Sequence, residues 1–568
     1  MNIKIVSNYL KLKYRRQFIA TFTQLEQFSH WQHVTLPEVS FHIYAHPELY
    51  VSRVIANPEN GFYIIAIGFV IDPANPLKGT NEILGQLMNS HPRTIEFISL
   101  LISNLAGRFV IFVAFGKSLY VFHDPCGQRS VYYGKCNGFL YLASQPLIFA
   151  ELFALQNHKC ADAIRNSNYV KHEIEYWFPS SLSFYENINK LIPNHYLDVS
   201  RQKQIRYWPI REIAQTCFEN TCQETADILK KMMVSAHSKF KLALSLSAGW
   251  DSRVVLAASK DIINDVFLYS YIIRSLNPRS PDIKVPHSMS NKLGLKHHIL
   301  DWRRTADGEY RKVYKSNVDT AHDDWCDIVF GASINYPQDR ICVQGSCSEI
   351  VRCFYYPCGT HDQIKSAKEL IEIVQPAWKD LPLIENCLDG WLRDAQTVCT
   401  KNNIDILDLF YWEHRVGSWL AQSQTESDIL REVFTPFNYR PLLSKMLGIP
   451  YEYRIGETNF MYWKIVETLW PELLNWPINP PFYGWVPKMK HVISWKYRRS
   501  IRDRIKKASI NLLKKTGLYE QARKTYRFFK QHVHKRHPTI WGTCPGPFLS
   551  PDLYQFAMWE LMSIVTLR

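Results

Sequence analysis

The chain has 568 residues, of which 46% are hydrophobic and 21% are charged, and its formal net charge is +15 at pH 7. This composition is normal for a globular protein, and the length favours about two or three domains. No apolar run approaches the ~20 residues that span a bilayer. The N-terminus has no apolar core followed by small residues, so we expect no secretory signal and a cytoplasmic location.

The chain carries 13 cysteines, an odd number, and none is spaced as CxxC. This usage is typical of reduced thiols in an intracellular protein. Cys342, Cys347, Cys353 and Cys358 lie close together in the sequence. Their spacing is not that of a zinc site, so we expect a role in the core rather than metal binding.

Residues 1–210 are predicted to form an α+β domain with packed antiparallel sheets, because short runs rich in β-branched and aromatic residues alternate with turn signals. The longest apolar run, Phe62–Ile71, has the length of one strand. The expected strands and helices are Phe62–Ile71, Arg108–Phe115, Leu119–His123, Thr80–Ser90 and Thr94–Asn104.

Residues 211–484 follow another pattern, in which strands alternate with helices. This alternation predicts an α/β domain with a doubly wound parallel sheet. Residues 365–470 are expected to be mostly helical. The expected elements before them are Glu224–Ser238, Lys241–Leu246, Ser252–Lys260, Asp265–Tyr271, Lys284–Gly294, His297–Asp301 and Arg340–Gln344.

Residues 485–568 are predicted to form a basic, largely helical tail. Between Trp485 and Ile540 stand 17 lysines and arginines and two acids, so the rest of the chain is neutral overall. A basic amphipathic helix suits an anionic membrane surface, reached from the periphery, or an acidic partner. The alternative is a helix that packs on the protein with a solvated cationic face. No nucleic acid is expected, because no base-reading motif accompanies the charge.

The most informative segment runs from Leu246 to Ser252, where a buried strand passes through small residues into a helix. Such a junction directs backbone N–H groups and a helix N-terminus at one point, which suits a phosphate. Ser247 and Ser252 can donate hydroxyl hydrogen bonds, and Asp251 suits Mg²⁺. The alternative is a plain strand–turn–helix connection with a polar N-cap.

This segment resembles the SGGxDS pyrophosphate loop of the asparagine synthetase family, with Ala248 in place of the usual first glycine. A methyl group matters there only if the position needs a positive φ. Further resemblances to the family, in the expected order over roughly residues 225–480, are Ser280-Pro281-Asp282, Asn291–Gly294, His297-His298, Gly345–Glu349, Thr435–Arg440, Ile449-Pro450 and Arg454.

The resemblance implies an ATP-pyrophosphatase-type domain that uses ATP and Mg²⁺ to adenylate a carboxylate. Its implied nucleotide-binding residues are Leu246, Ser247, Ala248, Gly249, Asp251, Ser252, Gly345 and Ser346. Asp251 is the implied magnesium ligand, and Glu349 is the implied catalytic residue, with a structural salt bridge to Arg352 as the alternative role.

Two departures from the family pattern weaken the catalytic prediction. Ser348 stands where the family has an aspartate, so one magnesium ligand is missing. Asn479 stands where it has a lysine, and a neutral amide cannot supply charge to a developing oxyanion. Lys464 and Lys488 are candidate substitutes for that lysine.

The first domain resembles the family's glutaminase domain, an Ntn-hydrolase-like antiparallel sandwich. Gly107-Arg108-Phe109, Asp124–Gly127, Tyr132-Tyr133 and Ala143–Gln145 carry this resemblance. Glutamine hydrolysis there needs an N-terminal cysteine, whose α-amine is the base and whose thiolate is the nucleophile.

That cysteine is missing, because residue 2 is Asn2 and the first cysteine is Cys126. Ser7 and Thr21 are poor substitutes, since neither directly follows Met1. We therefore expect a scaffold without glutaminase activity.

The leading hypothesis is an amide-forming ligase that adenylates a carboxylate for attack by ammonia or a substrate amine. The alternative is a catalytically inactive nucleotide-binding scaffold. A sulfur-transfer or tRNA-modifying enzyme with the same loop ranks last.

Overall fold

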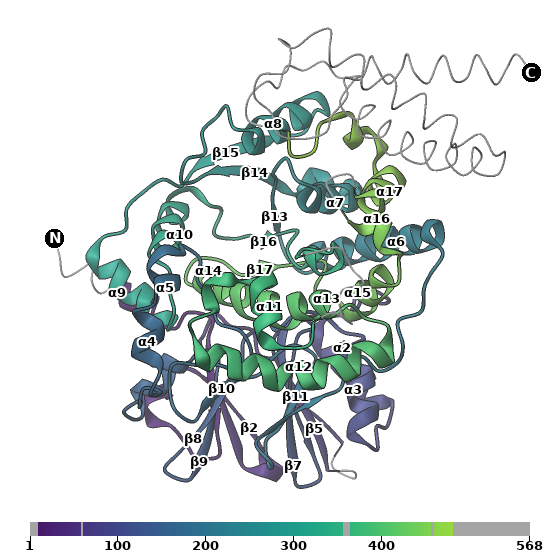
Figure 1. Cartoon of the computed structure of the whole chain (residues 1–568). Coiled ribbons are helices and arrows are strands. Elements are labelled where there is room, and N and C mark those ends of the chain that lie inside the picture. Colours follow the sequence, from purple (N-terminus) through teal and green to yellow (C-terminus); the bar gives the residue numbers. More distant parts are fainter. Residues whose placement is uncertain (1–8, 58–60, 356–363, 456–458, 481–568) are drawn as a thin grey trace, which may run out of the picture. The chain divides into compact units, whose positions relative to one another are not determined.

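The computed structural model describes residues 9–57, 61–355, 364–455 and 459–480 (Figure 1). Two six-stranded antiparallel sheets come first in the chain, and a five-stranded parallel sheet follows. The predicted change from antiparallel to parallel sheets is thereby confirmed. The predictions for the tail at 485–568, its helix and its partners, lie outside the described residues.

The two antiparallel sheets have the orders β10-β8-β9-β1-β3-β2 and β12-β11-β7-β6-β5-β4. Their strands are β1 Phe18–Thr21, β2 Gln32–Leu36, β3 Phe41–Ala45, β4 Ile55–Asn57, β5 Phe62–Ile71, β6 Ala106–Phe115, β7 Ser118–His123, β8 Tyr132–Cys136, β9 Phe139–Ala143, β10 Ile188–Lys190, β11 His195–Asp198 and β12 Lys203–Arg206. The helices of this part are α2 Thr80–Asn89, α3 Ile95–Ser103, α4 Ala161–Arg165 and α5 Asn168–His172.

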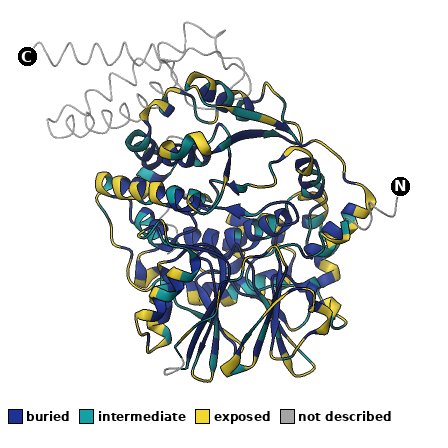
Figure 2. Cartoon of the chain, turned by 180° about the vertical axis from the view of Figure 1, so that it is seen from behind, coloured by how far each residue is buried: buried dark blue, intermediate teal, exposed yellow. Residues whose placement is uncertain are grey.

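β5 is buried along its whole length, and Figure 2 shows how much of the chain's interior is buried. Successive side chains of a strand point to opposite faces. Ile65 and Ile67 therefore enter the core between the two sheets, whereas Ile64 and Ala66 pack under α2 and α3. A strand that is buried on both faces reads as a continuous apolar run, and the predicted bounds Phe62–Ile71 are confirmed.

The parallel sheet has the order β15-β14-β13-β16-β17. Leu242 and Leu244 face α6 and α7, and Ala243 faces α9 and α10, so helices cover both faces as predicted. The elements are β13 Leu242–Ser245, β14 Phe267–Ile272, β15 His297–Asp301, β16 Ile341–Val343, β17 Val433–Phe434, α6 Phe218–His237, α7 Trp250–Ala258, α8 Pro281–Lys292, α9 Gly308–Asn317 and α10 Asp323–Asn335.

Residues 365–470 are mostly helical, as predicted, but the prediction missed the edge strand β17. Val433 and Phe434 pair with Cys342 and Val343 of β16, and a strand this short carries no periodicity of its own. The helices are α11 Ala367–Val374, α12 Pro382–Asn402, α13 Ile406–Phe410, the π-helix η8 Tyr411–Leu420, α14 Ala421–Ser427, α15 Arg440–Leu447, α16 Tyr451–Arg454 and α17 Phe460–Leu469.

A buried group of charges joins the antiparallel sheets to the helical region. The Arg108 guanidinium contacts Asp428 through Nη2 and Oδ2 at 2.8 Å and Glu432 through Nη1 and Oε1 at 2.9 Å. Arg129 lies 2.6 Å from the same Glu432 oxygen. Two arginines and two carboxylates therefore neutralise one another away from water.

Within the described residues, no helix is both long enough and apolar enough to cross a bilayer.

Candidate functional site

The predicted phosphate loop lies at the carboxyl end of β13, between Ser245 and the first residue of α7, Trp250 (Figure 1). Its neighbour β16 is parallel, so the turn after Val343 emerges at the same edge of the sheet. Ligands of open α/β sheets bind outside the carboxyl ends of the strands. The topology therefore brings the segments 246–252 and 345–349 together.

The loop's polar groups are arranged around the two serines. The backbone N–H of Ser247 donates to Ser252 Oγ at 3.1 Å, and the N–H of Gly249 donates to Ser247 Oγ at 3.2 Å. The N–H of Ala248 donates to Asp282 Oδ1 at 2.9 Å. The three loop N–H groups thus donate to side chains of the protein itself, and an anion would have to displace these bonds.

Ala248 and Leu246 support the loop from within. Ala248 is not among the residues with positive φ, so its methyl group is accepted without backbone strain. It is buried, and the buried Leu246 extends the pairing of β13 by donating from its N–H to Tyr269 O at 2.7 Å. Their side chains pack in the core, which leaves ligand contacts to the backbone.

Gly345 allows the second turn to lie directly on the loop. A Cβ at this position would stand 2.6 Å from the carbonyl carbon of Asp251, closer than van der Waals contact allows. Ser346 lies in the same turn, and Cys347, with φ of 70°, leads into the 3-10 helix η6 Ser348–Val351. A larger residue than glycine at this position would have to displace Asp251.

Asp251 is held by a cation and a hydroxyl. Arg352 Nη1 lies 2.7 Å from both carboxylate oxygens of Asp251. Ser348 donates its hydroxyl to Oδ1 of the same carboxylate. The alternative role considered for Glu349 was a salt bridge to Arg352, but the Arg352 guanidinium forms its ion pair with Asp251.

Glu349 lies beside this pair and carries an altered proton affinity. Burial and the nearby Asp251 carboxylate raise the pKa of Glu349 to about 7, against a partial opposing effect of Arg352. A carboxyl group whose pKa lies near neutrality is suited to accept a proton at physiological pH.

Asn479 also lies at the loop. Its backbone N–H donates to Ala248 O at 3.1 Å, and its side-chain Oδ1 would stand 3.4 Å from a Cβ on Gly249. Lys464 is one of the two candidate substitutes for the lysine that Asn479 replaces. Its ammonium group forms an ion pair with Glu467 at 2.7 Å. Lys488 lies outside the described residues.

Arg253 explains why a segment from 200 residues away reaches the loop. It is buried on α7, and its Nη1 donates to Leu473 O at 2.9 Å and to Trp476 O at 3.1 Å. Its Nη2 donates to Pro477 O at 3.1 Å. The sequence interpretation missed this contact, because an arginine inside an apolar helix face gives no signal of its carbonyl partners.

The sequence predicts a magnesium ligand at Asp251. The described residues contain no group of three or more His, Cys, Asp and Glu side chains able to hold a metal alone. Mg²⁺ often takes only one or two carboxylates and completes its shell with phosphate and water. In this structure the Asp251 carboxylate is paired with Arg352.

The side chains at and near β1 take part in the packing of the antiparallel sheets. Gln17, directly before β1, is buried and donates its side-chain amide to Asn317 O at 2.8 Å. Thr21 is buried and donates its hydroxyl to Leu140 O at 2.9 Å. Cys126 is fully buried, and Ser7 lies outside the described residues. Thr21 and Cys126, which carry the hydroxyl and the thiol among these side chains, are therefore both buried.

Comparisons with known proteins identify no family. No family model matches the chain, and no curated protein matches it. A structure of glutamine phosphoribosylpyrophosphate amidotransferase from B. subtilis complexed with ADP and GMP is 9% identical over 52% of this chain and 61% of that chain, with a TM-score of 0.22. A structure of an allosteric regulatory enzyme of purine biosynthesis is 11% identical over 53% of this chain and 78% of that chain, with a TM-score of 0.21.

The chain thus spans 61% of the length of the first of these structures. TM-scores this low establish neither a common fold nor a common chemistry. The functional argument therefore depends on the site itself.

Proposed function

We propose that the protein is an ATP-dependent carbon–nitrogen ligase of asparagine synthetase type. It adenylates a carboxylate, with release of pyrophosphate, and transfers the acyl group to ammonia or a substrate amine. It does not hydrolyse glutamine. The main support is the convergence of the loop 246–252, the turn 345–349 and Asn479 at one edge of a parallel sheet.

The proposed chemistry assigns a role to each part of the site. The N–H groups of the loop and the N-terminus of α7 would bind the pyrophosphate portion of ATP. A carboxylate oxygen of the substrate attacks the α-phosphorus, and the bond to pyrophosphate breaks. Bound Mg²⁺, held by Asp251, would neutralise phosphate charge.

The second step forms the amide. The nitrogen attacks the acyl carbon, the bond to AMP breaks, and Glu349 accepts the proton that the nitrogen loses. A base with a pKa of about 7 is half ionised near neutral pH, so it can take up this proton without being permanently protonated.

Removal of the Asp251 carboxylate tests the proposal. Asp251→Ala is expected to weaken binding of ATP with Mg²⁺ at least tenfold, measured by calorimetry, and to reduce pyrophosphate release from ATP and a panel of carboxylates. Asp339→Ala is the matched control, because Asp339 pairs with Lys241 on the surface. Tight ATP binding by wild type without pyrophosphate release from any carboxylate would refute the ligase.

Asn479→Lys is expected to increase pyrophosphate release about 10-fold or more, because an ammonium group beside Gly249 would stabilise negative charge on the leaving group. Asn479 has φ of 42°, so the lysine costs about 1 kcal/mol of folding free energy. Asn479→Met is the control, because it adds length without charge. Equal rates for the lysine and methionine variants would show that charge at this position is unimportant.

A second candidate is a nucleotide-binding scaffold without catalysis. It is favoured by the contacts of Asp251, whose carboxylate is already neutralised by Arg352. In that case ATP binds in the absence of Mg²⁺ as well as in its presence. In the ligase, Mg²⁺ must displace Arg352 from Asp251, so ATP binding depends on the metal.

A further inference from the structure

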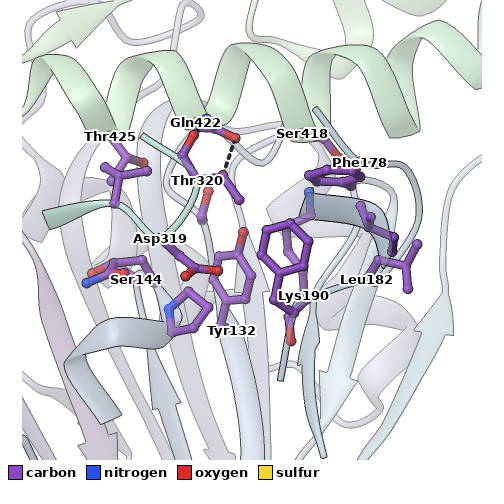
Figure 3. Close-up of a pocket in the computed structure, with 17 residues that line it drawn as sticks. Tyr132, Ser144, Phe178, Leu182, Lys190, Asp319, Thr320, Ser418, Gln422 and Thr425 are labelled. Carbon is purple, nitrogen blue, oxygen red and sulfur yellow. Dashed lines mark hydrogen bonds between the residues drawn. The ribbon is translucent and has the colours of Figure 1, made fainter. Parts of the chain in front are cut away.

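A cavity lies between strands of the antiparallel part and the helices η8 and α14 (Figure 3). Side chains from several elements line it, among them Tyr132, Phe178, Leu182, Lys190, Asp319 and Ser418. Among the described residues, those that line the cavity include none from the phosphate loop 246–252 or the turn 345–349. Chemistry in this cavity is therefore separable from the chemistry of the loop.

Lys190 is a buried amine in this cavity. It is 4% exposed, and its ammonium group donates a hydrogen bond to Ser418 Oγ. Burial alone lowers the pKa of Lys190 to about 7, because a charged amine is costly away from water and no carboxylate among the described residues offsets that cost. A large fraction of Lys190 is therefore neutral near pH 7, and a neutral amine can accept a proton.

Ser418 is the partner that can give up such a proton. It is buried and lies on the π-helix η8, and stretches of π-helix are rare and are often found at functional sites. A serine hydroxyl is a weak nucleophile until a neighbouring base takes its proton. A neutral lysine in hydrogen-bond contact with a serine supplies that base, as in the Ser–Lys variants of the catalytic triad.

The other side chains of the cavity suit an uncharged acyl group. Lys190 pairs directly with Tyr132 across β10 and β8, so both side chains lie on the same face of the sheet, and the phenol is a donor for a carbonyl oxygen. Phe178 and Leu182 contribute apolar surface. Asp319 also lines the cavity, and its carboxylate disfavours a negatively charged substrate.

We propose that Ser418 and Lys190 form a catalytic dyad that hydrolyses an uncharged carboxylic ester. The hydroxyl oxygen of Ser418 attacks the carbonyl carbon while the Lys190 amine takes the hydroxyl proton. The bond between the acyl carbon and the alcohol oxygen breaks, and the alcohol leaves with that proton. Water then attacks the acyl group on Ser418, Lys190 passes a proton of this water to the serine oxygen, and the carboxylic acid is released.

The test is hydrolysis of p-nitrophenyl acetate by the full chain without ATP, with the acetylated residue located by peptide mass spectrometry. Wild type is expected to carry the acetyl group on Ser418. Ser418→Ala and Lys190→Met should each reduce the enzyme-dependent rate by about 100-fold or more, and Lys190→Met should leave Ser418 unacetylated. Ser333→Ala and Lys203→Met are the controls, because both side chains are exposed, and both should hydrolyse the ester as wild type does.

Thermal unfolding of each variant checks its folding. Lys190→Met removes a buried charge and should not destabilise the protein. If it does not fold, Ser418→Ala and the position of the acetyl group in wild type still decide the question. An acetyl group on Lys190 instead of Ser418 would identify a reactive amine without a serine nucleophile and would overturn the proposal. Unchanged hydrolysis in either variant, or wild type without acetylated Ser418, would overturn it as well. Because ATP is absent, none of these results bears on the ligase.

Discussion

Glu349→Gln is expected to reduce the rate of amide formation by about 10²–10⁴-fold. The same substitution is expected to stabilise the protein at pH 8. The loss of rate follows because glutamine cannot accept the proton of the attacking nitrogen. Glutamine keeps the shape of the protonated carboxyl group, so the turn over Asp251 should be preserved.

The gain in stability follows from the raised pKa of Glu349, about 7 in the folded protein against an ordinary 4.5. The native state binds this proton more tightly than the unfolded chain, so wild-type stability falls as the pH rises from 4.5 to 7, and the loss is complete above 7. Glutamine removes this loss of stability, which is at most about 3–4 kcal/mol.

Urea unfolding at pH 5 and pH 8 measures this effect. The variant should be about equal to wild type at pH 5 and more stable at pH 8. Glu372→Gln on the exposed side of α11 is the control and should leave both values unchanged. If the variant is less stable than wild type at pH 8, the ionised Glu349 carboxylate stabilises the fold through Arg352. The pKa of Glu349 would then not be raised.

Asp428→Ala is expected to destabilise the protein by about 3–5 kcal/mol, because it leaves the Arg108 guanidinium buried without its main partner. The two side chains are 1% and 2% exposed. Glu432 alone would then face both Arg108 and Arg129. Chemical unfolding followed by tryptophan fluorescence measures the change in the free energy of unfolding.

The double variant Asp428→Ala with Arg108→Met separates the lost pair from the lost packing. It should be more stable than Asp428→Ala alone, because the unpaired charge is gone. Asp394→Ala is the control, since Asp394 pairs with Arg206 at the surface and is 56% exposed. A double variant as unstable as the single one would show that charge burial is not the cause.

Much of the candidate site was predictable because its signals are local. Small residues between a strand and a helix define the phosphate loop whatever the rest of the chain does, and the bounds of β13 and α7 differ from the predicted ones by only one or two residues. Buried strands such as β5 are visible as apolar runs. In contrast, β17 has two residues, and its existence depends on β16 as its partner.

The sequence by itself determined that antiparallel sheets precede a parallel sheet and that Ser247, Gly249 and Asp251 stand at a strand–helix junction. Only the tertiary structure decided that Arg352 holds Asp251, that Arg253 draws Asn479 to the loop, and that Lys190 and Ser418 share a cavity. The physical reason is the distance along the sequence over which each interaction acts. Backbone geometry and hydrophobic periodicity act between near neighbours, whereas ion pairs and cavities join residues that only the packing of distant segments brings together.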